Sequence, residues 1–298
     1  MSITATRFAT HLRTWLLIAA LTGLLIAIGA AIGGGFLYAF VFLAVGMNLV
    51  GYWFSDKIAL RASRAQPLEE GQAVWLRRIV ADLADRASVP IPRLYLIPSD
   101  QPNAFATGRN PKNSAVAVTT GLWRRLEPQE VEGVLAHELS HIANRDVLIM
   151  TVASFFAMLA ALLTRFGMYG GLFGGGRGRD NNGVPVWLIV LLVSIATYFL
   201  SQILILAISR YREYAADRGS ALITGAPEHL MSALQKIASD MFRIPQQDLR
   251  EVEGMNAFFI IPTSVKSTTS QLFLTHPPLE KRLEALSRIA REMGRPVA

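Results

Sequence analysis

A long stretch without a single charged side chain constrains this sequence more than any other feature. Residues Trp15 to Phe54 contain no Asp, Glu, Lys or Arg, and Gly33-Gly34-Gly35 divides them into two apolar segments, Trp15–Ile32 and Phe36–Phe54. Each segment has nearly the ~20 residues that a helix needs to cross a bilayer. The first is longer than the ~7–15 apolar residues of a signal peptide. The stretch therefore predicts two retained membrane-spanning helices.

Two further apolar segments follow, Val147–Leu163 and Val184–Ile208. Hydrophobic residues make up 52% of the 298-residue chain and charged residues only 17%, whereas soluble domains carry about 25% charged residues. These figures favour an integral membrane protein with four transmembrane helices, which places both termini on one side of the bilayer.

The basic residues predict which side that is. The loops on the side of the termini carry most of the Lys and Arg near the span ends: Arg7, Arg13, Lys57, Arg61, Arg64, Arg145, Arg210 and Arg212. The opposite loops carry only Arg165, Arg177 and Arg179. Because cytoplasmic loops are enriched in Lys and Arg, both termini are expected in the cytoplasm. We interpret the net charge of +7 in the same way, as a membrane-facing feature rather than a nucleic-acid surface.

Two polar regions lie between and after the spans, and their patterns mix helices with short strands. The helices are expected at Leu68–Ala87, from Glu127 onward, at Pro227–Asp240 and at Pro278–Glu292, and the strands at Leu94–Ile97 and within 103–108 and 114–122. The resulting division is 1–56, a two-span membrane hairpin; 57–146, the first cytoplasmic part; 147–208, a second hairpin with a Gly-rich outer loop; and 209–298, the second cytoplasmic part.

The sequence "HELSH" at 137–141 carries the most specific chemical signal. On a helix, His137 and His141 project from one face, roughly 5–6 Å apart at Cβ, which suits two imidazoles on one zinc ion. Glu138 between them can take a proton from zinc-bound water, whose pKa zinc lowers to about 7. The chain has no cysteine, so any metal must be held by His and carboxylate.

A third ligand is expected in "SRYREYAADRGSA", which follows the fourth apolar segment. Glu213 is the candidate, with Asp217 one turn later as a hydrogen-bond acceptor for a ligand histidine. Taken alone, both could be solvated partners of nearby arginines. If the helices stay continuous, however, His141 and Glu213 lie roughly 9 and 7.5 Å beyond their span ends, at one level in the cytoplasm.

Four stretches together, "AHELSHIANRDV", "SRYREYAADRGSALITG", "NAFATGRN" and "THPPLEKRLEAL", resemble the HtpX-type membrane metallopeptidases, a gluzincin family related to the CAAX prenyl protease. The resemblance covers nearly the whole chain. It implies one Zn²⁺ held by His137, His141 and Glu213, with Glu138 as the catalytic glutamate. It also implies a mainly α integral membrane protein with a cytoplasmic α+β zincin-like domain and a small sheet. The implied activity is an inner-membrane endopeptidase that degrades misfolded or damaged membrane proteins, or unfolded polypeptides, in quality control during stress.

Two further assignments remain open. The resemblance suggests that the strand Asn103-Ala104-Phe105-Ala106-Thr107 borders the cleft, where an extended substrate could pair with its edge; Asn103 could equally be a turn residue after Pro102. His276 could steady an oxyanion or only help to cap the following helix.

Three other functions compete with the endopeptidase. A transporter usually has ionisable residues inside its spans, and these segments have none. A non-catalytic zinc-binding scaffold would not require Glu138 beside the ligands. A CAAX-type processing protease would share the chemistry, but that resemblance implies more spans than four.

Overall fold

The structure, a computed structural model, describes residues 42, 45, 46, 49–69, 71–151, 186–241 and 277–295. These fall into two compact units: the first contains the described residues of 53–148 and 209–295, and the second those of 49–52 and 149–208, together with residues 42, 45 and 46. The first apolar segment, most of the second and third, and the Gly-rich loop lie outside the described residues. No helix among the described residues is long and apolar enough to cross a membrane.

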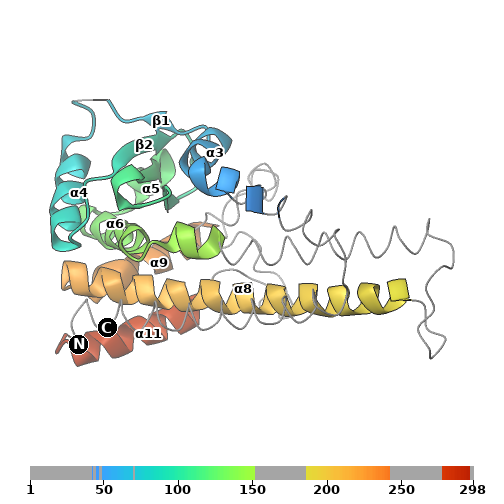
Figure 1. Cartoon of the computed structure of the whole chain (residues 1–298). Helices are drawn as coiled ribbons and strands as arrows, with labels where there is room; N and C mark the ends of the chain where they lie inside the picture. Colours follow the sequence, from blue (N-terminus) through green and yellow to red (C-terminus); the bar gives the residue numbers. More distant parts are fainter. Residues whose placement is uncertain are drawn as a thin grey trace. The chain divides into compact units, whose positions relative to one another are not determined.

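The first unit is α+β, as expected, with a small sheet and helices on both of its faces (Figure 1). Its elements are α3 (Ser55–Ala62), β1 (Gln66–Pro67), α4 (Val74–Arg86), β2 (Arg93–Ile97), β3 (Ala104–Thr107), η1 (Pro111–Asn113), β4 (Ala115–Thr119), α5 (Thr120–Arg125), α6 (Pro128–Ala143), the end of α8 (Val186–Thr224), α9 (Pro227–Met241) and α11 (Leu279–Glu292). The expected strand Leu94–Ile97 and the helices at Glu127, Pro227 and Pro278 are confirmed within a residue or two. The expected helix at Leu68–Ala87 begins only at Val74, and the last part of the expected strand within 114–122 is the start of α5.

The sheet is mixed, with the order β1-β2-β4-β3. β2 and β4 are parallel, and β1 and β3 each add antiparallel to their neighbour. Every residue of β4 is buried, and the period of two along a strand explains its sequence. Val116 and Val118 face the main core, while Ala115 and Ala117 face α3. In the strand order, β3 lies at one edge of the sheet.

Helix α6 lies at the centre of the unit, packed against β3, α4 and α9. Pro128 occupies its first turn, and the Glu130 carboxylate accepts a hydrogen bond from the N–H of Glu127 at 2.8 Å, which fixes where the helix starts. A buried stripe that includes Val131, Leu135 and Leu139 belongs to the main core. This burial makes α6 a rigid platform for the HELSH residues at its C-terminal end.

The helix that carries HELSH does not continue into the next apolar segment, contrary to the expectation of one straight helix. α6 ends at Ala143; Asn144 and Arg145 form a turn, and helix resumes at Asp146. Arg145 has a left-handed backbone, with φ 56°, a common way for a helix to end. The height of roughly 9 Å for His141 was conditional on an unbroken helix, and this condition is not met. By contrast, α8 is unbroken from Val186 to Thr224, as expected.

Candidate metal centre

The two histidines of HELSH face each other on the last turns of α6. Their Nε2 atoms lie 3.1 Å apart and their rings are perpendicular, with centroids separated by 4.7 Å. The His137 side chain is enclosed, at 1% exposed, whereas that of His141 is 17% exposed. The spacing of four residues thus places both rings on one helical face, as predicted.

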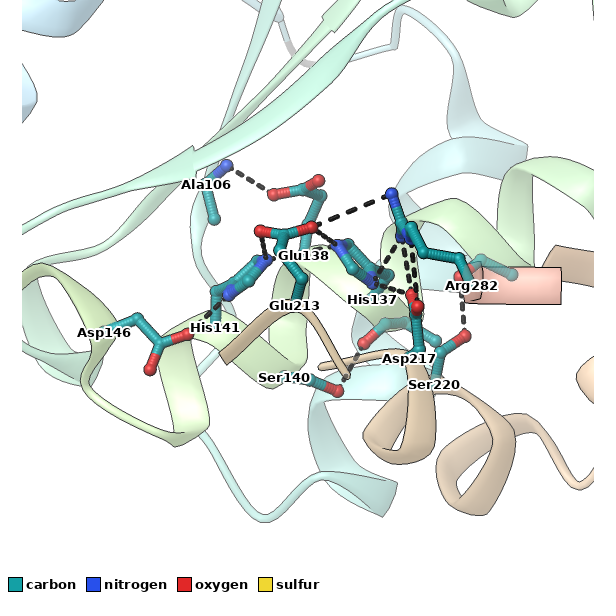
Figure 2. A network of polar contacts seen from close by, with 12 residues as sticks. Ala106, His137, Glu138, Ser140, His141, Asp146, Glu213, Asp217, Ser220 and Arg282 are labelled. Carbon is teal, nitrogen blue, oxygen red and sulfur yellow. Dashed lines mark hydrogen bonds and ion pairs between the residues drawn. The ribbon is translucent and has the colours of Figure 1, made fainter. Parts of the chain in front are cut away.

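Glu213 reaches the same point from α8 (Figure 2). Its carboxylate oxygens lie 3.6 Å from Nε2 of His137 and 3.5 Å from Nε2 of His141. One ligand atom from each of the three residues can be chosen so that all lie within 4.8 Å of one another. Two segments far apart in the sequence therefore supply a compact set of two nitrogen donors and one carboxylate.

Each histidine is oriented through its other ring nitrogen. Nδ1 of His137 lies 3.0 Å from Oδ1 of Asp217, and Nδ1 of His141 lies 2.5 Å from Oδ2 of Asp146. Asp217 was expected here from its position one turn after Glu213. Asp146 was missed, because five residues of continuous helix after His141 would have turned it away from the ring.

A buried arginine from the C-terminal helix completes this side of the centre. Arg282 of α11 is 1% exposed and donates two hydrogen bonds to Asp217, at 2.6 and 2.9 Å. Burial raises the pKa of Asp217, but Arg282 and His137 together outweigh it and hold the pKa below its usual range. The sequence contained a signal for it: Arg282, Leu286 and Ile289 recur at helical spacing, which places a charge on the apolar stripe of α11.

The donors fit a zinc ion. Because Nδ1 of each histidine faces a carboxylate, we assign the ring proton to Nδ1, and the Nε2 lone pairs then converge on each other and on the Glu213 carboxylate. Three acceptors at this distance repel one another unless a cation lies between them. Burial lowers the pKa of His137, but its contacts with Asp217 and Glu213 outweigh that and raise the pKa to about 9. With no cation between the donors, a proton on His137 takes that place, and metal binding would displace it and free the Nε2 lone pair.

Glu138 lies beside this donor set and is also buried, at 5% exposed. Its Oε2 accepts a hydrogen bond of 2.8 Å from the backbone N–H of Ala106 in β3 (Figure 2). Burial raises the pKa of Glu138, opposed by the nearby histidines. A carboxyl group placed beside the donors can take up a proton and later release it.

The strand expected to border the centre does so through Ala106. Asn103, at the start of this strand, exchanges hydrogen bonds with Thr119: its N–H donates to Oγ1, and its carbonyl accepts from the N–H of Thr119, both at 2.9 Å. A hollow that is open to solvent is lined by residues that include Thr107, Gly108 and His141. His276 lies outside the described residues.

Comparison with known proteins gives a consistent result. The model of "Peptidase family M48" matches residues 70–290. "Protease HtpX homolog" of Moorella thermoacetica is 48% identical over 94% of this chain and 93% of the relative, and "Protease HtpX homolog 1" of Streptomyces coelicolor is 51% identical over 82% and 80%. The crystal structure of S. mikatae Ste24p is similar in fold, with a TM-score of 0.56 and 21% identity over 95% of this chain, which spans 66% of that chain.

The fold and the donor set define a metalloprotease whose substrates are peptides or proteins and whose implied cofactor is zinc. Within that class, the chain belongs to peptidase family M48. The resemblance drawn from the four sequence stretches is therefore confirmed at the level of the family.

Proposed function

We propose that this chain is a zinc-dependent, membrane-integrated endopeptidase that cleaves misfolded or damaged membrane proteins on the cytoplasmic side of the membrane. His137, His141 and Glu213 hold the metal, and Glu138 is the catalytic base. The observation that supports this most directly is the convergence of the three donors within 4.8 Å, beside a buried carboxyl group that does not belong to the set. The four apolar segments and the positive-inside bias support the membrane location.

Bound zinc supplies Lewis acidity, which lowers the pKa of water and polarises a carbonyl group. The chain's own residues then move the proton. Glu138 accepts a proton from the attacking water through a carboxylate oxygen, while the oxygen of that water bonds to the carbonyl carbon. As the carbon–nitrogen bond breaks, Glu138 gives the proton to the departing amine. The Ala106 N–H keeps the Glu138 carboxylate at the donor set.

The edge of β3 supports extended binding of a substrate. The N–H of Thr119 donates to the carbonyl of Asn103. Along an antiparallel pair, hydrogen-bonded and non-hydrogen-bonded pairs alternate, so Phe105 and Thr107 form the next hydrogen-bonded pairs with β4. The backbone groups of Ala104 and Ala106 face away from β4. The N–H of Ala106 is already bonded to Glu138, so an extended substrate would pair with the other groups of this edge. Pairing with this edge depends on backbone rather than on side chains, which suits an enzyme that acts on many damaged proteins. His276 stays a predicted oxyanion-binding residue.

The test compares full-length wild type with Glu138→Gln on an unfolded protein substrate, with zinc content measured in parallel. General-base catalysis contributes about 10²–10⁴-fold, so we expect a loss of at least about 10² in cleavage rate at unchanged zinc content. Glu132→Gln is the matched control, since Glu132 lies on α6 but pairs with Arg86. Equal cleavage by wild type and Glu138→Gln would refute the proposed role of Glu138. Zinc retained after loss of both His137 and His141 would refute the ligand assignment.

A further inference from the structure

Each of the two histidines is linked through an aspartate to an arginine on a different helix. On one side the series is His137, Asp217 of α8 and Arg282 of α11, described above. On the other it is His141, Asp146 and Arg212. Nε of Arg212 lies 2.8 Å from Oδ1 of Asp146, a close ion pair although not a well-aligned hydrogen bond. Asp146 and Arg212 are both buried, at 2% and 7% exposed.

The turn after α6 brings Asp146 to His141. Asn144 ends the helix, and after the left-handed backbone of Arg145 the side chain of Asp146 contacts the ring of His141. A residue with a side chain adopts this conformation at a cost of about 1–2 kcal/mol relative to glycine. The backbone strain at Arg145 therefore lies directly before the residue that contacts His141.

His141 depends on its contact with Asp146 more than His137 depends on its contact with Asp217. The enclosed side chain of His137 is held by packing on all sides, whereas that of His141 is 17% exposed and borders the open hollow next to Thr107 and Gly108. Packing alone therefore leaves the His141 ring more freedom to rotate. A fixed hydrogen-bond acceptor at Nδ1 removes that freedom and sets the tautomer.

We propose that Asp146 is the positioning residue for His141 and that Arg212 acts through it, by holding the buried carboxylate in place. Arg212 directly precedes Glu213, so the same ion pair ties the turn after α6 to the part of α8 that carries the third donor. The inference rests on the proposed function, in which these donors hold zinc. It assigns Asp146 and Arg212 to zinc affinity and not only to folding.

Zinc affinity of the full-length protein, measured by competition with a chromophoric chelator, tests this. Loss of an outer-shell partner of a metal ligand typically costs 10–100-fold in affinity, so we expect Asp146→Ala to bind zinc about 10–100-fold more weakly. Asp146→Asn should recover much of this loss, because its amide oxygen can still accept the proton of Nδ1. Arg212→Gln should weaken binding, and adding it to Asp146→Ala should have little further effect.

Glu130→Gln provides the matched control for a purely structural role. Glu130 is also a buried carboxylate associated with α6, and it pairs with Lys236 of α9 at 2.7 Å, away from the histidines. We expect this variant to lower the midpoint of thermal unfolding without changing zinc affinity. Zinc affinity within twofold of wild type in Asp146→Ala, or additive effects of the two substitutions, would overturn the proposal. Failure of the wild type itself to bind zinc would instead overturn the proposed function.

Discussion

Gly219 lies where α8 touches α6, and its replacement by alanine tests how the two helices bring the donors together. A β-carbon at this position would lie 2.3 Å from Oγ and 2.8 Å from Cβ of Ser140. The hydroxyl group can rotate away, but Cβ is fixed to the backbone of α6. Since non-bonded carbon atoms pack at about 3.5–4.0 Å, the helices must separate by roughly 0.7 Å or more at this point.

The energetic cost follows from two opposing terms. Overpacking costs about 1–3 kcal/mol, while replacing a helical glycine by alanine returns about 1 kcal/mol. We therefore expect Gly219→Ala to lower the free energy of unfolding by about 1 kcal/mol. The effect on the metal centre should be larger, because Glu213 lies on α8 and both histidines lie on α6. We expect zinc affinity to fall about tenfold, as for other disturbances around a metal ligand.

The double variant Ser140→Gly/Gly219→Ala moves the glycine from α8 to α6 and restores the space between them. Thermal unfolding and chelator competition on the wild type, both single variants and the double variant give the coupling between the two positions. We expect the double variant to bind zinc more tightly than Gly219→Ala alone. If its affinity is no better, the close contact between Gly219 and Ser140 does not control the position of Glu213, and the reasoning fails.

Two further predictions concern charge and location. Burial raises the pKa of Glu130, but hydrogen bonds from Lys236, Ser232 and the Glu127 N–H outweigh it, so the pKa lies below its ordinary 4.5. Its stabilisation is then complete above pH ~4.5 and is lost as the pH falls; the difference in unfolding midpoint between wild type and Glu130→Gln should shrink on acidification, and a constant difference contradicts this. The second prediction concerns the side of the membrane. The chain has no cysteine, so the substitution Asp82→Cys, at an exposed position of α4, introduces a single reactive thiol. An impermeant maleimide should label Asp82→Cys in inside-out but not right-side-out membrane vesicles, and the reverse pattern would contradict the cytoplasmic assignment.

What the sequence revealed about this site depended on whether a contact follows from regular spacing. His137 and His141, and separately Glu213 and Asp217, are four residues apart, and an unbroken helix converts that spacing into a shared face. Asp146 escaped prediction because its contact requires the helix to break at Arg145. Arg282 lies in an amphipathic helix, but its partner is on α8, and no local pattern specifies that pairing.

The charges around the donors form a balanced set once a divalent cation is included. Among the described residues, four buried carboxyl groups lie around the donors: Glu138, Asp146, Glu213 and Asp217. Two buried arginines neutralise part of this charge, Arg212 beside Asp146 and Arg282 beside both Asp217 and Glu213. With neutral histidines and ionised carboxylates, the formal charge is −2. Burying unpaired charges is costly, and contacts with Asp217 and Glu213 raise the pKa of His137 against the opposing effect of burial. A Zn²⁺ ion at the three donors would cancel the formal charge of the site, so within the described part of the chain the two arginines reduce the negative charge to what one ion can neutralise.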